Sequence, residues 1–195
     1  DIRVSRSSRE IYLLGKTRNA MQEELKEYIS NLQTATAAKE RIESELAIAH
    51  GIQQGILPKV FTENRNIDIH AVLMPARQVG GDFYDFIFLD EETICFAIGA
   101  VSDKGVPAAL MMAMTLTLFR ANANKDMDIR EIVSKINREI CRENESMMFI
   151  TFFMGILDLP SGLVHYCNAG HNYPYRLKRD GSLEIISTTH GLPLG

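Results

Sequence analysis

Two short segments of this 195-residue chain combine carboxylates and glycines with an adjacent apolar run. Residues 79–85 read Val-Gly-Gly-Asp-Phe-Tyr-Asp, and residues 98–109 read Ile-Gly-Ala-Val-Ser-Asp-Lys-Gly-Val-Pro-Ala-Ala. The paired glycines before Asp82 allow a tight turn and the close approach of an ion. Hard cations such as Mg²⁺ and Mn²⁺ prefer oxygen ligands, and a pair of them can hold a phosphoryl group and generate hydroxide from water. Asp82 is therefore the best metal-ligand candidate, although Gly-Gly-Asp is commonly an ordinary turn.

The other polar residues near these segments have simpler interpretations. Asp85 could interact with a metal ligand without binding the metal itself, but we expect it to be an exposed residue at a strand end. Ser102 or Asp103, just before Val106, is expected to cap a helix rather than to bind metal. His171 could act as an acid or base near neutral pH, yet no partnered carboxylate lies nearby in the sequence. We expect His171 to be a turn residue whose ring hydrogen-bonds the loop.

Composition limits the function classes. A hydrophobic fraction of 46% and a charged fraction of 24% suit one core-forming domain with an extension. The formal net charge of -4 provides no basic face, so we expect no nucleic-acid partner. The three cysteines lack a CxxC pair, and we interpret them as reduced core residues of a cytoplasmic protein. We also interpret as core residues the methionines at 111, 112, 114, 147, 148 and 154. There is no apolar run of about 18 residues and no signal peptide.

Residues 10–57 contain no proline and carry a narrow apolar seam at alternating steps of three and four. Its members are Leu14, Met21, Leu25, Tyr28, Leu32, Ala35, Ile42, Leu46, Ala49 and Ile56, interrupted by Arg18, Lys39 and Gln53. A seam this narrow and long predicts a parallel coiled coil, and hence a homodimer. The alternative is a single helix folded back on its own domain. His50, beside the seam, is expected to be exposed.

After Pro58 the pattern changes to strands, two helices and further strands. Strands are predicted at residues 68–74, 83–89, 93–99, 148–157, 163–167, 173–177 and 183–186, and helices at 106–123 and 128–144. Residues 83–99 should form an antiparallel hairpin. This order predicts an α+β fold, an antiparallel β-sandwich with flanking helices, rather than a doubly wound sheet.

Six blocks in order resemble landmarks of one protein family, at residues 49–58, 79–85, 101–110, 148–151, 168–171 and 191–195. The family is the SpoIIE/RsbU-type branch of the metal-dependent (PPM) serine/threonine protein phosphatases. Residues 14–25 resemble, less specifically, the closing helix of a HAMP signal-relay module. The resemblance implies a HAMP-like end and linker helix at 1–43 and a phosphatase domain of α-β-β-α type at 44–195 that lacks its C-terminal part.

The resemblance also implies an activity and a site. The activity is removal of phosphate from a serine or threonine of a small phosphoprotein, such as an anti-sigma-factor antagonist, with two Mn²⁺ or Mg²⁺ ions supplying the nucleophilic water. Asp82, a bridging acid at position 100 and the backbone carbonyl of Val101 would hold the metals. The substrate-loop candidates are Gly81, Asn168, Gly170 and His171, and the candidate regulatory positions are Ile52, Leu57, Val106 and Ala109.

This chain departs from the family pattern in two ways. Ala100 stands where the bridging acid is expected, and a methyl group cannot coordinate a cation. The chain also stops at Gly195, before further acids of the family, so we interpret it as a catalytically impaired fragment. Because its neighbours match the active pattern, Ala100 is interpreted as an engineered or recent Asp→Ala change. The alternative function is a non-catalytic module that binds a phosphoprotein or dimerises, and a membrane anchor upstream in the parent stays open.

Overall fold

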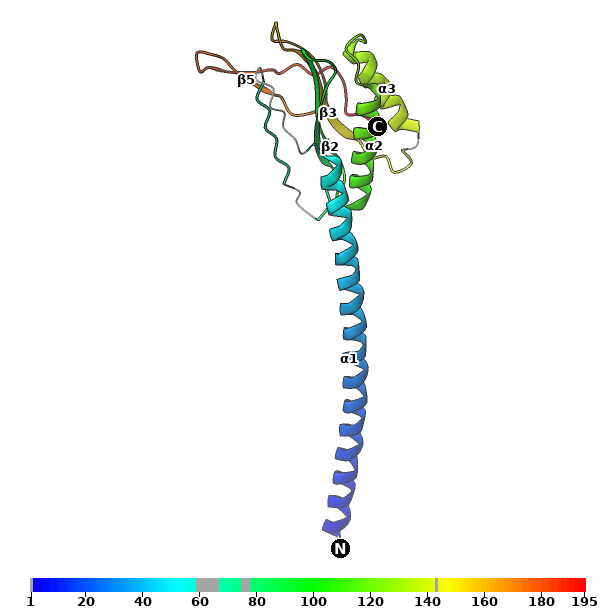
Figure 1. The fold of residues 1–195 in the computed structure, drawn as a ribbon. Coiled ribbons are helices and arrows are strands. Elements are labelled where there is room, and N and C mark those ends of the chain that lie inside the picture. The colour runs from blue at the N-terminus through cyan, green and yellow to red at the C-terminus, as the bar shows by residue number, and fades with distance from the viewer. Residues whose placement is uncertain (1, 59–66, 75–77, 143) are drawn as a thin grey trace. The chain divides into compact units, whose positions relative to one another are not determined.

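The computed structural model describes residues 2–58, 67–74, 78–142 and 144–195, with side chains from Arg9 onward (Figure 1). The chain divides into two compact units, with the boundary along the chain between Ala47 and Ile48. The domain boundary predicted between residues 43 and 44 stays a prediction. No helix in the described part of the chain is long and apolar enough to cross a membrane.

The described residues of the first unit are all helical and belong to α1, Ile2–Ile56. Its seam side chains are largely exposed; Leu25, Leu32 and Ile42, for example, are 54–57% accessible. The ion pairs Glu23–Lys26, Lys39–Glu43 and Arg41–Glu45 add only about 0.2–0.5 kcal/mol each. Most helix stability in proteins comes from packing of an apolar face. In the single chain, the seam of this unit is largely without such packing.

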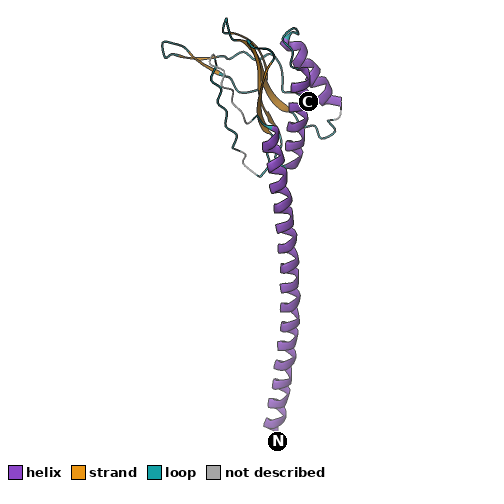
Figure 2. Ribbon diagram, viewed as in Figure 1, coloured by secondary structure: helices purple, strands orange, loops and turns teal. Residues whose placement is uncertain are grey.

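The second unit is built on a four-stranded antiparallel sheet in the order β1-β2-β3-β4 (Figure 2). The strands are β1 Asp82–Phe88, β2 Thr93–Val101, β3 Ile150–Asp158 and β4 Leu163–Ala169. Helices α2, Val106–Asn122, and α3, Ile129–Arg142, pack on one face of the sheet. Strands β5, Tyr175–Leu177, and β6, Leu183–Ile185, form a separate hairpin. The predicted α+β class, the antiparallel β1–β2 hairpin and both helices are confirmed.

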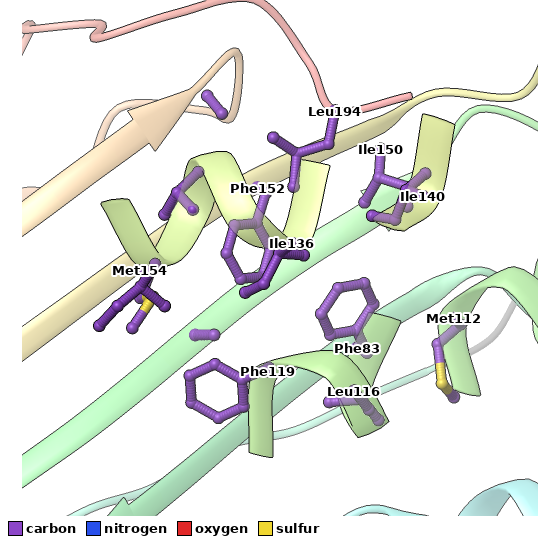
Figure 3. Close-up of a cluster of buried hydrophobic side chains, with 14 of the residues drawn as sticks. Phe83, Met112, Leu116, Phe119, Ile136, Ile140, Ile150, Phe152, Met154 and Leu194 are labelled. Carbon is purple, nitrogen blue, oxygen red and sulfur yellow. The ribbon is translucent and has the colours of Figure 1, made fainter. Parts of the chain in front are cut away.

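The core lies between the sheet and these two helices (Figure 3). Alternate residues of the strands point to this side, which gives β2 its buried positions Cys95, Ala97 and Val101. The helices contribute side chains with no exposed surface, such as Met112, Leu116, Phe119, Ile136 and Ile140. Phe83 and Phe152 meet them from the sheet with ring centroids 6.2 Å apart.

Four sequence predictions about these elements are wrong. Residues 68–74 form no strand, although their side chains alternate between half-buried and exposed, because a strand also requires a pairing ladder. Cys141 is exposed, since it lies one residue beyond the buried Ile140 and so points about 100° away around α3. Met147 is 87% exposed with a positive φ of 50°.

The fourth error concerns the start of α2. Its N-cap is Gly105, at φ 78°, and no side chain in the part of the chain that the structure describes caps it. Ser102 instead accepts a hydrogen bond from the Phe149 N–H, 3.0 Å away, which extends the β2–β3 pairing. Asp103 accepts one from the Lys104 N–H at 2.7 Å. Pro107 in the first turn lacks an N–H, which removes one group that would need a cap.

Two substitutions on α2 test where the core lies. Met112→Ala should lower the free energy of unfolding by about 2–5 kcal/mol, because it leaves a cavity at a fully buried position. Leu110→Ala, on the same helix but 67% exposed, should change it by about 0.5 kcal/mol or less. Urea unfolding followed by tyrosine fluorescence measures both. Equal losses would contradict this packing.

Candidate active site

The β-sheet register places the metal-ligand candidates in one row. Asp82, the first residue of β1, lies opposite Ala100 in β2, and Ala100 lies opposite Thr151 in β3. Directly paired residues share a face, with Cβ atoms about 4.5–5.5 Å apart. Because Phe83 points into the helix-covered core, Asp82 and this row lie on the other face. The structure therefore brings Asp82 and the alanine at position 100 together.

Close packing shapes the turn before Asp82. A Cβ on Gly81 would lie 2.8 Å from the Val101 Cβ and 3.1 Å from the Ala108 Cβ. Glycine is therefore needed for the turn to lie against the end of β2 and the first turn of α2. The Val101 N–H also donates to the Gly81 carbonyl at 3.3 Å. Gly81, predicted as a substrate-loop residue, is a packing position in this structure.

A buried glutamine holds the same turn from the other side. The Gln53 side-chain amide donates to the Gly80 carbonyl at 2.6 Å, and its oxygen accepts from the Gly80 N–H at 3.2 Å. Gln53 is only 5% exposed. In the sequence this residue stands out only as an interruption of the apolar seam. The polar character of this seam position was the signal in the sequence that its side chain bonds a group other than a second helix.

Asp85 is buried, which corrects the expectation of an exposed strand-end residue. It is 3% exposed, and its carboxylate accepts a bond from the Arg120 Nε at 2.6 Å and from the Phe86 N–H at 2.9 Å. Arg120 also donates to the Ile56 carbonyl at 2.7 Å. One guanidinium thus joins β1, α2 and the end of α1. Only the carboxylate of this ion pair is buried, since the Arg120 side chain is 42% exposed, and removing Arg120 would leave a costly buried charge.

A second buried amide fixes the loop after β4. Asn168, with no exposed surface, accepts a bond from the His171 N–H at 2.8 Å and donates to the His171 carbonyl at 3.1 Å. Gly170 has φ 70°, and a Cβ there would lie 2.7 Å from the Pro193 ring. These constraints explain why asparagine and glycine occupy these two positions, which were predicted as substrate-loop residues, and they set the course of the chain at His171.

The His171 ring joins the Asp82 row. Its Nδ1 lies 2.9 Å from the Thr151 hydroxyl, which in turn donates to the Ala100 carbonyl at 3.3 Å. Burial lowers the pKa of His171, while the Thr151 backbone and the Asp82 charge act in the opposite direction. The ring therefore bonds a strand rather than the loop, contrary to the prediction. Because Thr151 lies in the same row as Asp82, its bond to His171 places the two titratable groups at the same end of the sheet.

The predicted regulatory positions are not equivalent. Leu57 is buried in the core, whereas Ile52 and Val106 are 63% and 45% exposed and Ala109 is half-buried. His50, expected to be exposed, is half-buried, and its Nδ1 is a buried nitrogen with no hydrogen-bond partner among the described residues. Only Leu57 of the four regulatory candidates is a core contact.

The residues of this row do not fit a two-metal centre. Asp82 brings one carboxylate, Ala100 a methyl group and Thr151 a neutral hydroxyl. A dinuclear Mn²⁺ or Mg²⁺ site needs several anionic oxygen ligands. Within residues 2–58, 67–74, 78–142 and 144–195, no group of three or more His, Cys, Asp or Glu side chains could hold a metal.

Comparisons with known proteins agree on one family. The family model described as Stage II sporulation protein E (SpoIIE) matches residues 90–195. Phosphoserine phosphatase RsbU of Bacillus subtilis is 30% identical over 163 residues, which cover 84% of this chain and 48% of RsbU. The chain thus spans about half the length of this relative.

Two solved structures share the fold. The SiaA-PP2C domain of Pseudomonas aeruginosa matches with a TM-score of 0.68 and 19% identity, covering 82% of this chain and 65% of that one. The RsbU and RsbW domains of Rv1364c from Mycobacterium tuberculosis match with a TM-score of 0.55 and 28% identity, covering 62% and 33% of the two chains. A PP2C-type fold and a SpoIIE-type sequence therefore coincide in this chain.

Gln53→Glu tests the clamp on the Gly80 turn. The carboxylate can still accept from the Gly80 N–H but cannot donate to its carbonyl, so the free energy of unfolding should fall by about 1–3 kcal/mol. Hydrogen exchange at the Gly80 amide should accelerate in Gln53→Ala, which removes both bonds. The neighbouring Gln54→Ala is the control, and equal exchange in both alanine variants would argue against the clamp.

Proposed function

We propose, since the chain belongs to the SpoIIE family of serine/threonine phosphatases, that it is a metal-dependent phosphatase domain of a bacterial signalling regulator, impaired by Ala100. The observation that carries this proposal is the pairing of Asp82 with Ala100 across β1 and β2. An aspartate at position 100 would bring a second carboxylate within about 5 Å of the first. That spacing would suit two oxygen ligands of shared cations.

The effect of alanine follows from charge. Hard divalent cations are bound in proportion to the number and charge of their oxygen ligands. With one carboxylate in the row, attraction for Mn²⁺ or Mg²⁺ is weak, and the ions that would activate water are not held. The Asp82 side chain is itself exposed, so water competes with it for any cation.

The proposed substrate is a phosphoserine or phosphothreonine of a small protein, such as an anti-sigma-factor antagonist. Support comes from RsbU, a phosphoserine phosphatase by name, and from the matching mycobacterial structure, which contains RsbU and RsbW domains. Such a partner implies a cytoplasmic location. The exposed cysteine Cys141 is compatible with a reducing compartment.

A second candidate is a module that binds a phosphoprotein without hydrolysing it. The incomplete donor set of the Asp82 row favours this reading for the chain as it stands. The two candidates differ in what a carboxylate at position 100 should do.

Ala100→Asp discriminates between them. We expect this variant to bind Mn²⁺ at least about tenfold more tightly, or about 1.4 kcal/mol, because a second carboxylate adds charge and a ligand. Isothermal titration with MnCl₂ measures the gain, and Mn²⁺-dependent phosphate release from a phosphoserine protein measures turnover.

Two matched variants control this experiment. Ala100→Asn has nearly the same shape as aspartate without the charge, and Asp82→Asn combined with Ala100→Asp removes the partner ligand. Neither should gain affinity. If Ala100→Asp gains neither Mn²⁺ affinity nor turnover while a phosphoprotein still binds, the binding module is the better description.

We also propose that the chain forms a homodimer through the seam of α1. The seam residues of the first unit recur at steps of three and four and are exposed in the single chain. A second copy in parallel register would bury them as knobs into holes. Lys39 and the small Ala35 in the seam limit the strength of this pairing.

Leu32→Asn together with Ile42→Asn should shift the chain toward monomer, with a dimer dissociation constant raised at least about tenfold. Ala37→Asn with Ser44→Asn places the same side chains on the opposite side of the helix and should leave dimerisation unchanged. Sedimentation velocity over a concentration series measures both. Unchanged sedimentation in the seam variant would exclude this interface.

A further inference from the structure

The Thr151 hydroxyl lies within hydrogen-bond distance of both the Ala100 carbonyl and the His171 ring. The Thr151 hydroxyl has one proton, which it donates to the Ala100 carbonyl. Its oxygen can then only accept from the His171 Nδ1, 2.9 Å away. This arrangement corresponds to the Nδ1–H tautomer of the neutral ring, which leaves the lone pair on Nε2, whereas a hydroxyl proton turned to Nδ1 would correspond to the Nε2–H tautomer.

The surroundings hold the ring in this position. Asn168 binds both the N–H and the carbonyl of His171, so the backbone cannot move without breaking two bonds at a buried amide. His171 also lines a cavity of about 470 Å³ together with Gly170, Asn172, Tyr173, Tyr175 and Ile185. This volume is within the usual range for a ligand site.

The chemistry of the free nitrogen limits what it can bind. An Nε2 lone pair accepts hydrogen bonds, whereas a phosphoserine group near neutral pH is mostly a dianion without protons to donate. The nitrogen is thus suited to an N–H of a polypeptide rather than to the phosphoryl oxygens. Tyr173 and Tyr175 give the cavity aromatic walls of the kind that pack against peptide side chains.

We propose that Thr151 is a positioning residue that fixes His171 as the Nδ1–H tautomer, and that the His171 Nε2 accepts a main-chain N–H of the polypeptide segment carrying the phosphoserine. The inference rests on the proposed function, because it assigns part of the substrate contact to residues beside Asp82. It requires neither a metal ion nor turnover.

Long-range ¹H–¹⁵N correlation spectra of the labelled chain test the positioning. His171 should be the Nδ1–H tautomer in the unsubstituted chain and in Thr151→Ser, which keeps the hydroxyl. In Thr151→Val, which has the same shape without it, the Nε2–H form should gain population. An Nε2–H tautomer in the unsubstituted chain would overturn the proposal.

His190 is an internal control in the same spectra. Its Nδ1 accepts from the Asn168 N–H at 3.1 Å, so it should be the Nε2–H tautomer in every variant. A His190 signal that changes in Thr151→Val would show that the variant disturbs the loop. In that case Thr151→Ser and His171→Asn decide the result, because they leave the Asn168 bonds in place.

The peptide contact is tested with acetyl-Ala-Ala-phosphoserine-Ala-Ala-amide, the unphosphorylated peptide and inorganic phosphate. We expect the phosphopeptide to shift the His171 Nε2 resonance and inorganic phosphate to leave it unchanged. Thr151→Val and His171→Asn should each weaken phosphopeptide binding about threefold to tenfold, the effect of one hydrogen bond, and Thr151→Ser should restore it.

The outcomes separate this inference from the proposed function. If the unsubstituted chain binds no phosphopeptide, both the proposed phosphoprotein partner and the proposed contact with the His171 Nε2 are wrong. The tautomer of His171 is measured separately and does not depend on that outcome. If the chain binds the phosphopeptide equally well in Thr151→Val and His171→Asn, the proposed function survives and this inference is wrong. A shift of His171 by inorganic phosphate alone would assign Nε2 to the phosphoryl group and overturn the peptide contact.

Discussion

The antiparallel register of β1, β2 and β3 is the constraint on which the site depends. It sets Asp82, Ala100 and Thr151 side by side on the face away from the helices, although the three residues are far apart in the chain. A shift of one residue in either ladder would turn one side chain of the row into the core. The chemistry at this end of the sheet is thus decided by pairing of the backbone, before any individual ligand matters.

Polar contacts anchor this register at its ends. Gln53 holds Gly80, Arg120 holds Asp85, and Asn168 holds the loop that carries His171. Each involves a side chain that is buried or largely buried, where an unmet hydrogen bond is costly. Gln53 and the Arg120 contact at Ile56 also connect the end of α1 to the strand that begins with Asp82. A displacement of that end of the helix would therefore also displace the candidate ligand Asp82.

Much of the fold followed from periodicity, whereas much of the site did not. The long helix and α3 were predictable because their apolar residues recur at helical spacing, and α2 because it is apolar on nearly every side. The β1–β2 hairpin was predictable because two apolar runs flank a polar turn at residues 90–92. The burial of Asp85 was not predictable, since its partner Arg120 lies 35 residues away and only the packing of α2 brings them together. The bond from His171 to Thr151 likewise depends on the course of a loop that Asn168 and Gly170 define. Local patterns carry no information on such encounters.

The methyl group of Ala100 has a consequence beyond lost coordination. Two ionised acids on adjacent strands at this spacing repel each other unless a cation lies between them, and one of them would have to take up a proton. With alanine, this end of the sheet carries no such conflict and can close without an ion. The folded state of the chain is thereby uncoupled from divalent metal, and it should be equally compact in a chelator and in a manganese buffer.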